Sequence, residues 1–133
     1  MTRTRILIAE DHKEMRDKVV QQLENDFEIV GSVSDGGAVV AMAPQILPDV
    51  CVLDISMPIL SGIEVAHELK ALGLTSRIIF LTVHEDQDFL EAAMDAGALG
   101  YVLKSRMGCD LVRAINAVMA GRVFVSPSSN LSS

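Results

Sequence analysis

Short apolar runs rich in β-branched residues recur along the chain, separated by stretches with a different pattern. Such runs predict buried strands, because a strand that is apolar at nearly every position must be covered on both faces. The stretches between them carry apolar residues at helical spacing, as at Met15, Val19 and Leu23. Five strands are predicted, at Arg5–Ala9, Phe27–Val33, Asp49–Leu53, Arg77–Val83 and Leu99–Leu103.

Capping residues mark where the intervening helices begin and end. Ser61 followed by Glu64 is a capping-box pattern that begins a helix, and Gly73 ends it. Gly97 ends the next helix, "DQDFLEAAMDA", in the same way. Pro44 lies within "AVVAMAPQIL", where it is expected to kink or shorten the second helix because it removes a hydrogen bond.

Strands that alternate with helices predict a mostly parallel sheet covered by helices on both faces. The expected fold class is therefore a doubly wound α/β domain, in which sites form beyond the carboxyl ends of the strands. A chain of 133 residues that is half apolar fits one such domain. Its end, "SPSSNLSS", has the composition of a flexible linker.

Charge and cysteine usage exclude several functional classes. A net charge of -7 argues against a nucleic-acid surface, which needs clustered Lys and Arg. Cys51 and Cys109 form no metal-binding or disulfide pattern and are expected to be reduced thiols. Since the sequence also has no apolar run of membrane-spanning length, a soluble, cytoplasmic protein without a membrane partner is expected.

Polar side chains follow four of the predicted strands. Glu10 and Asp11 come after the first strand, Asp54 after the third, Thr82 at the end of the fourth and Lys104 after the fifth. Each has an ordinary structural explanation on its own, such as a helix cap or a solvated charge. Because the carboxyl ends of parallel strands meet at one edge of a sheet, the coincidence of all of them indicates a functional site.

Three carboxylates at one site, Glu10, Asp11 and Asp54, repel one another unless a cation lies among them. Magnesium suits this set best, since it prefers oxygen ligands, and no His or Cys cluster suggests zinc. A carboxylate nucleophile, a metal ion, Lys104 and the hydroxyl of Thr82 match phosphoryl transfer to Asp54. The metal and Lys104 would offset charge on the phosphoryl oxygens, and Thr82 would donate a hydrogen bond to one of them.

This ordered set of motifs resembles the receiver domains of two-component response regulators, over residues 5 to 121. No single motif is specific, whereas the set in this order at these strand ends is very specific. It consists of Glu10-Asp11, the "DISMP" stretch with Asp54 and Pro58, Gly62, "LTVHED" with Thr82, and "GYVLKS" with Tyr101 and Lys104.

The resemblance implies a flavodoxin-like (βα)5 fold with a five-stranded parallel sheet of order 2-1-3-4-5, an order that the chemotaxis receiver exemplifies. It also implies that Asp54 is the phosphoacceptor. Asp11 would be a direct ligand of Mg2+, Glu10 would act beside it through water, and the main-chain carbonyl of Ser56 would be a further ligand. The protein would then be a switch that catalyses only its own phosphorylation and dephosphorylation, rather than an enzyme.

Thr82 and Tyr101 are implied to be a switch pair, in which the hydroxyl moves towards the phosphoryl group and the ring turns inward behind it. "AINAVMAGRVFVSP" and "LTVHED" are similar to the NarL/FixJ-like subgroup, whose receivers precede a LuxR-type helix-turn-helix domain. Residues 1–121 are then expected to be the receiver, and residues 122–133 the start of a flexible linker to an effector outside this chain. A stand-alone receiver is the open alternative.

The resemblance also implies the partners. A sensor histidine kinase would donate the phosphoryl group, and DNA would be bound only through the effector domain. A second copy is a candidate partner for the face made by the fourth helix, fifth strand and fifth helix, where Leu90, Met94 and Met119 cannot all be assigned to the core.

Two positions, Ser105 and Val83, depart from the family pattern. Ser105 follows Lys104, where the family's peptide is typically cis and often precedes proline, so its isomer is open. Val83 is bulkier than the Ala or Gly common after the family's Thr, which predicts restricted access to Asp54. His84 is either a residue that, with Ser56, tunes hydrolysis of the phosphoryl group or a plain surface histidine.

Other readings fit the sequence less well. A phosphatase of the haloacid-dehalogenase type normally has a second Asp two residues after the nucleophile as its general acid, and this chain has Ser56 there. A nucleotide- or flavin-binding domain lacks its GxGxxG or Walker loop. A receiver-like interaction module that works without phosphorylation is the main alternative, although such variants usually lose an acid, the Lys or the Thr, and none is lost here.

Overall fold

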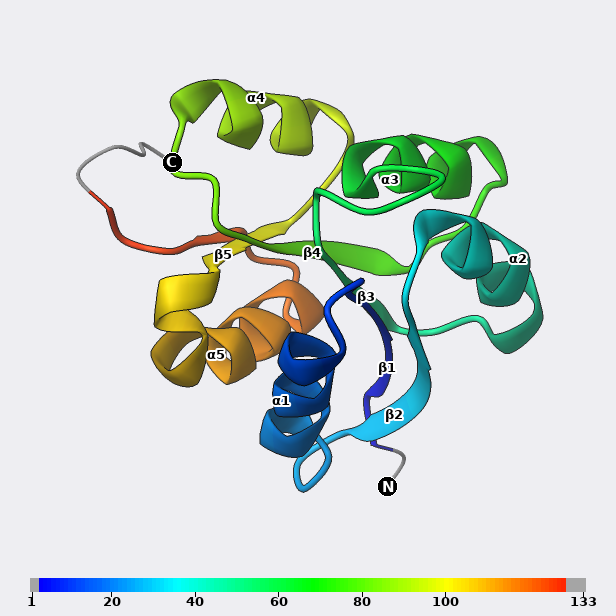
Figure 1. The fold of residues 1–133 in the computed structure, drawn as a ribbon, viewed down its shortest axis with the longest axis horizontal. Helices are drawn as coiled ribbons and strands as arrows, with labels where there is room; N and C mark the ends of the chain where they lie inside the picture. Colours follow the sequence, from blue (N-terminus) through cyan, green and yellow to red (C-terminus); the bar gives the residue numbers. More distant parts are fainter. Residues whose placement is uncertain (1–2, 129–133) are drawn as a thin grey trace.

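The computed structural model describes residues 3–128, and its strands form one parallel sheet (Figure 1). The strand order is β2-β1-β3-β4-β5-β6, so the predicted order 2-1-3-4-5 is confirmed and one strand is added. The strands are β1 (Arg5–Ala9), β2 (Glu28–Val33), β3 (Val50–Leu53), β4 (Arg77–Thr82), β5 (Gly100–Leu103) and β6 (Phe124–Val125).

Helices cover both faces of the sheet, as a doubly wound α/β fold requires. Figure 1 shows α1 and α5 on one face and α2, α3 and α4 on the other. None of the described helices combines the length and hydropathy needed to cross a lipid bilayer. The helices are α1 (Lys13–Leu23), α2 (Gly36–Ile46), α3 (Gly62–Ala71), α4 (Gln87–Asp95) and α5 (Met107–Met119), and a 3-10 turn, η1 (Lys104–Arg106), precedes α5.

Alternate residues of each central strand supply two separate hydrophobic clusters. In β1, Ile6 and Ile8 belong to the cluster beneath α1 and α5, whereas Leu7 and Ala9 belong to the cluster beneath α2, α3 and α4. Successive strand side chains point to opposite faces, so an apolar strand fills both layers at once. This explains why the strands read as continuous apolar runs, and the predicted flavodoxin-like fold is confirmed.

The predicted helix boundaries match the backbone. Ser61 accepts a hydrogen bond from the Glu64 backbone N–H, and Glu64 accepts one from the Ser61 N–H, which completes the capping box. Gly73 and Gly97 have positive φ angles of 77° and 97° just after α3 and α4, a conformation that glycine adopts without strain. Pro44 lies in the last turn of α2, which continues to Ile46.

The sheet has six strands, so the predicted count of five was wrong. Residues 124–125 form β6, which pairs in parallel with the outer edge of β5. A strand of two residues is too short for a period-2 pattern, which is why the pattern of the chain carries no signal for it. Part of the segment expected to be a flexible linker therefore packs onto the sheet, and Ser126 is only 1% exposed.

The three residues offered for an apolar surface do not lie together. Leu90 is 2% exposed and belongs to the core beneath α4, so it is not available to a dimer face. Met94 is partly buried against the same cluster, whereas Met119 packs against the cluster on the opposite face of the sheet. The helical spacing alone could not show which core each residue joins.

Candidate functional site

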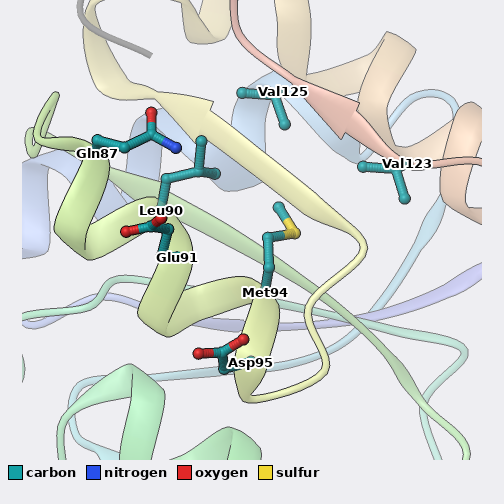
Figure 2. A pocket seen from close by; sticks show the side chains of 7 residues that line it. All are labelled: Gln87, Leu90, Glu91, Met94, Asp95, Val123 and Val125. Carbon is teal, nitrogen blue, oxygen red and sulfur yellow. The ribbon is translucent and has the colours of Figure 1, made fainter. Parts of the chain in front are cut away.

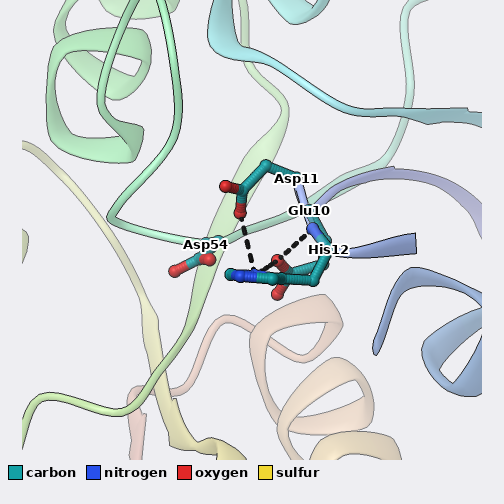
Figure 3. Close-up of side chains that lie close together, drawn as sticks. All are labelled: Glu10, Asp11, His12 and Asp54. Atoms are coloured by element: carbon teal, nitrogen blue, oxygen red, sulfur yellow. Dashed lines mark hydrogen bonds and ion pairs between the residues drawn. The ribbon is translucent and has the colours of Figure 1, made fainter. Parts of the chain in front are cut away.

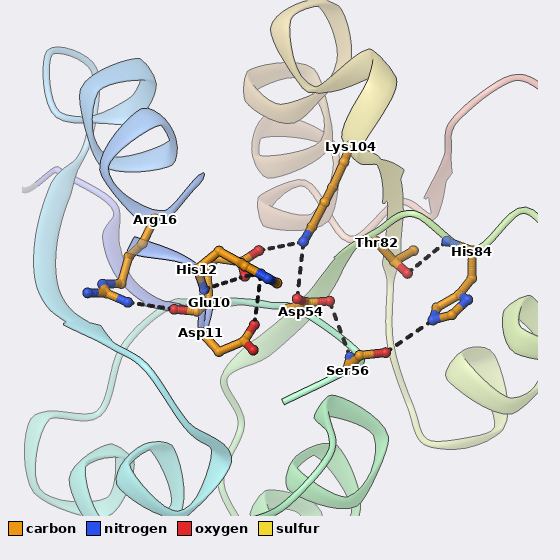
Figure 4. Close-up of polar contacts among 9 residues, drawn as sticks. All are labelled: Glu10, Asp11, His12, Arg16, Asp54, Ser56, Thr82, His84 and Lys104. Carbon is orange, nitrogen blue, oxygen red and sulfur yellow. Dashed lines mark hydrogen bonds and ion pairs between the residues drawn. The ribbon is translucent and has the colours of Figure 1, made fainter. Parts of the chain in front are cut away.

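The carboxyl ends of the strands bring the predicted residues to one edge of the sheet. Glu10 follows β1, Asp54 follows β3, Thr82 ends β4 and Lys104 follows β5 (Figure 4). These strands are consecutive neighbours in the sheet, since β1 pairs with β3, β3 with β4 and β4 with β5. The parallel topology, rather than proximity in the sequence, is therefore what assembles the site.

Lys104 joins two carboxylates at the floor of the site. Its Nζ lies 2.6 Å from Glu10 Oε1 and 3.1 Å from Asp54 Oδ2. All three side chains are largely withdrawn from solvent, with exposures of 12% for Lys104, 2% for Glu10 and 7% for Asp54. In such a site the ion pairs are screened little by water, so they strongly affect the protonation of each group.

The pKa values of the two carboxyl groups shift in opposite directions. Burial alone would raise the pKa of Glu10, but Lys104 and a hydrogen bond from the His12 backbone N–H lower it to about 2. Burial and the nearby charge of Glu10 raise the pKa of Asp54, and Lys104 offsets this only in part. Burial would lower the pKa of Lys104, yet its two carboxylate partners raise it. Lys104 therefore stays charged, and Asp54 is the less fully compensated acid.

Four side chains at this edge can hold a metal ion. Ligand atoms of Glu10, Asp11, His12 and Asp54 lie within 4.8 Å of one another (Figure 3). Asp11 Oδ1 is shielded from solvent, and His12 Nδ1 lies 3.3 Å from it. A shielded carboxylate oxygen beside two other carboxylates fits a hard divalent cation such as Mg2+.

His12 and Arg16 are site residues that the sequence reasoning did not single out. His12 Nδ1 lies 3.3 Å from both Glu10 Oε2 and Asp11 Oδ1, although 76% of the His12 side chain is exposed. The Arg16 guanidinium donates a 2.8 Å hydrogen bond to the Glu10 carbonyl (Figure 4). The position of His12 directly after the acidic pair was the available signal, whereas Arg16 is recognisable only once α1 is placed.

The predicted switch pair, Thr82 at the end of β4 and Tyr101 within β5, is joined through His84. Thr82 is fully buried, and its Oγ1 accepts a 3.1 Å hydrogen bond from the His84 backbone N–H. Tyr101 is also fully buried, and its hydroxyl donates a 2.9 Å hydrogen bond to the His84 carbonyl. Burial and the charge of Asp86 raise the pKa of Tyr101 to about 12. The ring is thus already turned inward, while the Thr82 hydroxyl is engaged with the β4–α4 loop.

The His84 ring is held on two sides and is not a plain surface side chain. It stacks on Phe89 of α4, with ring centroids 3.9 Å apart and planes 11° apart. His84 Nε2 also lies 3.2 Å from Ser56 Oγ, and the Ser56 N–H donates to Asp54 Oδ1 at 3.2 Å. Ser56 therefore links Asp54 to His84, although the role of the Ser56 carbonyl as a metal ligand stays a prediction.

The structure also shows the surroundings of Val83 and Ser105, the two positions that depart from the family pattern. Val83 is 69% exposed and lines a small pocket with Thr82 and Lys104 at the mouth of the site, where it can affect access. No peptide bond among the described residues is cis, so the bond between Lys104 and Ser105 is trans. It opens the 3-10 turn η1, which leads directly into α5.

This arrangement suits transfer of a group to a carboxylate. The Asp54 carboxylate has the Lys104 ammonium beside it and belongs to the group of side chains that can hold a metal ion. Both features stabilise negative charge that gathers on a phosphoryl group during transfer. The hydroxyl groups of Thr82 and Tyr101, which are hydrogen-bonded to the His84 backbone, can respond to such a charge by changing their hydrogen-bond partners.

Comparison with known proteins gives a consistent result. The response regulator receiver domain family matches residues 6–116. The nitrate/nitrite response regulator protein homolog of Haemophilus influenzae is 36% identical over 126 residues, which cover 93% of this chain and 61% of that protein. The chain thus spans about three fifths of the length of the curated relatives it matches.

Solved structures of response regulators are also similar to this chain. A LuxR-family two-component response regulator from Aurantimonas has a TM-score of 0.89 and 32% identity, covering 96% of this chain and 91% of that chain. A structure of two RcsB dimers bound to two parallel DNAs has a TM-score of 0.87 and 28% identity, covering 97% of this chain and 66% of that chain. Both similarities extend over nearly the whole of the present chain.

Proposed function

Because the chain belongs to the response regulator receiver domain family, we propose that it is switched by phosphorylation of Asp54. Receivers of this family are signalling domains of transcriptional regulators rather than enzymes that convert an external substrate. The observation that carries the assignment is the Lys104 ammonium 3.1 Å from a buried Asp54 whose pKa is raised. The ammonium offsets the negative charge of phosphoryl oxygens that approach this carboxylate, which can then act as the nucleophile.

The proposed donor is the phosphohistidine of a sensor histidine kinase. A carboxylate oxygen of Asp54 attacks phosphorus and forms a P–O bond while the P–N bond of the donor breaks. The electron pair of that bond stays on the imidazole, which takes a proton from solvent. Lys104 stays protonated throughout and compensates charge on the transferred phosphoryl oxygens, because both of its carboxylate partners keep its pKa raised.

We assign the metal site to Mg2+, with Asp11 and Asp54 as ligands and Glu10 acting through water. The shielded oxygen of Asp11 beside the carboxylates of Glu10 and Asp54 supports this assignment. When bound, the ion supplies positive charge that draws the phosphoryl oxygens and the nucleophile together. Glu10 stays ionised through its contact with Lys104, so it keeps negative charge available to the ion at neutral pH.

The proposed response begins at Thr82. Its hydroxyl leaves the His84 backbone N–H and donates to a phosphoryl oxygen instead, which frees the β4–α4 loop to shift. Tyr101 then holds the new loop position through its hydrogen bond to the His84 carbonyl. The Val83 side chain at the mouth of the site would slow entry of bulky donors.

The partners of the whole protein follow from the relatives. We propose that residues 1–121 are the receiver and that the chain continues, past residues 122–133, into a DNA-binding effector, since it spans about three fifths of its relatives. Homodimers are proposed because RcsB dimers have been solved on DNA. In this chain β6 covers the edge of β5, so a dimer on that face has to use α4 and α5. The proposed compartment is the cytoplasm, where such a regulator meets DNA.

The assignment is tested by the mass of the intact protein after incubation with acetyl phosphate. With Mg2+ the native chain is expected to gain one phosphoryl group, and with EDTA it is expected to gain none. Asp54→Asn should gain none under either condition, because the nearly isosteric Asn lacks the nucleophilic oxygen. Asp17→Asn is the matched control, since Asp17 pairs with Lys13 on the surface of α1 and should leave the gain unchanged.

The alternative is an interaction module that works without phosphorylation. Absence of any mass gain in the native chain, together with Mg2+ binding by calorimetry, would favour restricted entry of the small donor. Absence of both the gain and Mg2+ binding would contradict the proposal and favour the interaction module.

A further inference from the structure

The chain does not leave the domain at the end of α5 but turns back along the outer edge of β5. The Phe124 N–H donates to the Leu99 carbonyl at 2.9 Å, and the Ser126 N–H donates to the Tyr101 carbonyl at 2.8 Å. We call residues 123–126 the strap. The strap satisfies backbone groups that an edge strand otherwise exposes.

A buried polar contact holds the end of the strap. Ser126 Oγ accepts a 3.0 Å hydrogen bond from the Leu103 N–H and donates one of 2.8 Å to Asp110 Oδ2. Asp110 is 1% exposed, and Arg106 Nε donates to the same carboxylate at 2.8 Å. Each buried polar atom in this contact has a partner, so replacing Ser126 would leave a backbone N–H without its acceptor and would weaken the solvation of a carboxylate.

Apolar side chains hold the rest of the strap. Val125 packs against the cluster beneath α4, and Phe124 packs against the cluster beneath α5, so the strap closes both layers at the sheet edge. Figure 2 shows Val123 and Val125 across a groove from Leu90 and Met94 of α4. The strap therefore lies between the two helices that flank β5.

The strap is bonded to the strand that carries Tyr101. Val125 is paired with Tyr101 in the sheet, and the buried Tyr101 hydroxyl donates to the His84 carbonyl. The His84 N–H in turn donates to Thr82 Oγ1. One run of hydrogen bonds thus connects the end of β4 with the strap.

We propose that the strap couples the environment of Tyr101 to the path of the chain beyond residue 126. Release of the strap loosens the Tyr101 ring, and a rearrangement at Tyr101 loosens the strap, because a coupling between two sites acts in both directions. The proposal deepens the proposed function by naming its output path. Its test needs no phosphorylated protein, so it can fail or succeed independently of the assignment of Asp54.

The test uses Tyr101 as its own reporter, since the chain has one tyrosine and no tryptophan. Ser126→Ala removes the hydroxyl that holds the strap. Ser32→Ala is the matched control, because Ser32 is exposed on β2 at the opposite edge of the sheet. Amide hydrogen exchange at Phe124 reports the strap, and quenching of tyrosine fluorescence by acrylamide reports the ring.

Ser126→Ala is expected to speed exchange at Phe124 by about tenfold and to increase quenching of Tyr101, while Ser32→Ala changes neither. Val125→Asp, checked for folding by far-UV circular dichroism, should give the same pair of changes through loss of apolar packing. Unprotected exchange at Phe124 in the native chain would overturn the proposal, as would failure of both variants to speed that exchange. Faster exchange with unchanged quenching of Tyr101 would also overturn it, because the strap would then be docked without being coupled.

Discussion

The ends of β1 and β3 lie side by side and each carries a buried carboxylate, yet folding shifts the pKa values of the two acids in opposite directions. Glu10 at the end of β1 has Lys104 Nζ at 2.6 Å and a backbone N–H at 3.0 Å, and its pKa falls to about 2. Asp54 at the end of β3 has Lys104 at 3.1 Å and a backbone N–H at 3.2 Å, and its pKa is raised.

The difference shows how one lysine can serve two acids with separate roles. Lys104 lies closer to Glu10 than to Asp54, so Glu10 stays ionised and its ionised form stabilises the folded chain. Burial and repulsion by Glu10 destabilise the ionised form of Asp54. A bound cation therefore stabilises Asp54 more than Glu10, and Asp54 is the more basic of the two carboxylates. In this account Glu10 is the fixed charge of the site and Asp54 is its reactive group.

Removal of the shared cation should have the largest effect. Lys104→Met leaves both buried carboxylates without their cation and is expected to lower the free energy of unfolding by about 3 to 5 kcal/mol at pH 7 without metal. Urea unfolding measures this loss. Addition of Mg2+ should restore part of it, because the ion binds the folded state and neutralises the same acids.

Lys13→Met is the control for that experiment. Lys13 pairs with Asp17 in an exposed contact on α1, where solvent screens the charges. Its replacement should leave the unfolding midpoint unchanged within error. Equal losses in the two lysine variants would show that Lys104 does not compensate buried charge.

Replacement of the fixed acid should have the next largest effect. A pKa of about 2 in the folded chain against an ordinary value of 4.5 corresponds to about 3 kcal/mol of stability at neutral pH. Because this pKa is lowered on folding, the contribution is present above about pH 4.5 and is lost as the pH falls towards 2. Glu10→Gln should therefore be less stable than the native chain at pH 7 and approach it near pH 2, as followed by urea unfolding at a series of pH values. A constant difference across that range would contradict the role of Glu10.

Replacement of the reactive acid should have a smaller effect of opposite sign. The pKa of Asp54 is raised on folding, so its ionised form opposes folding at neutral pH and this cost disappears as the pH falls below its ordinary value of 3.8. Asp54→Asn should therefore be more stable than the native chain at pH 7 and without metal, by less than Glu10→Gln loses. The same unfolding series measures this, and a loss of stability in Asp54→Asn would show that the two acids are equivalent.

The apolar pattern was sufficient to predict the strands of the main sheet, because strands buried on both faces and capped helices leave clear local signals, whereas the strand order was predicted from the family resemblance. The pattern also predicted that Glu10, Asp54 and Lys104 would meet, since the carboxyl ends of parallel strands share one edge. It could not show that Lys104 lies closer to Glu10 than to Asp54, because that distance depends on side-chain packing.

Other features depend on contacts between distant parts of the chain. The strap was missed because its two-residue strand has no periodicity and its end is held by Asp110, which lies 16 residues earlier. The stacking of His84 on Phe89 was missed because it depends on how the β4–α4 loop turns. The hydrogen bonds of Thr82 were likewise not predictable, because the same residue type in a strand most often has only a packing role.

Asp54, and not its more strongly compensated neighbour Glu10, is the proposed phosphoacceptor. Borohydride reduces an acyl phosphate to an alcohol, so it converts a phosphorylated aspartate into homoserine. After treatment with acetyl phosphate and Mg2+, then borohydride, sequencing of the peptides by mass spectrometry identifies the modified residue. We expect homoserine at position 54 and an unmodified Glu10-Asp11 pair. Reduction at Glu10 or Asp11, with Asp54 intact, would contradict the proposal.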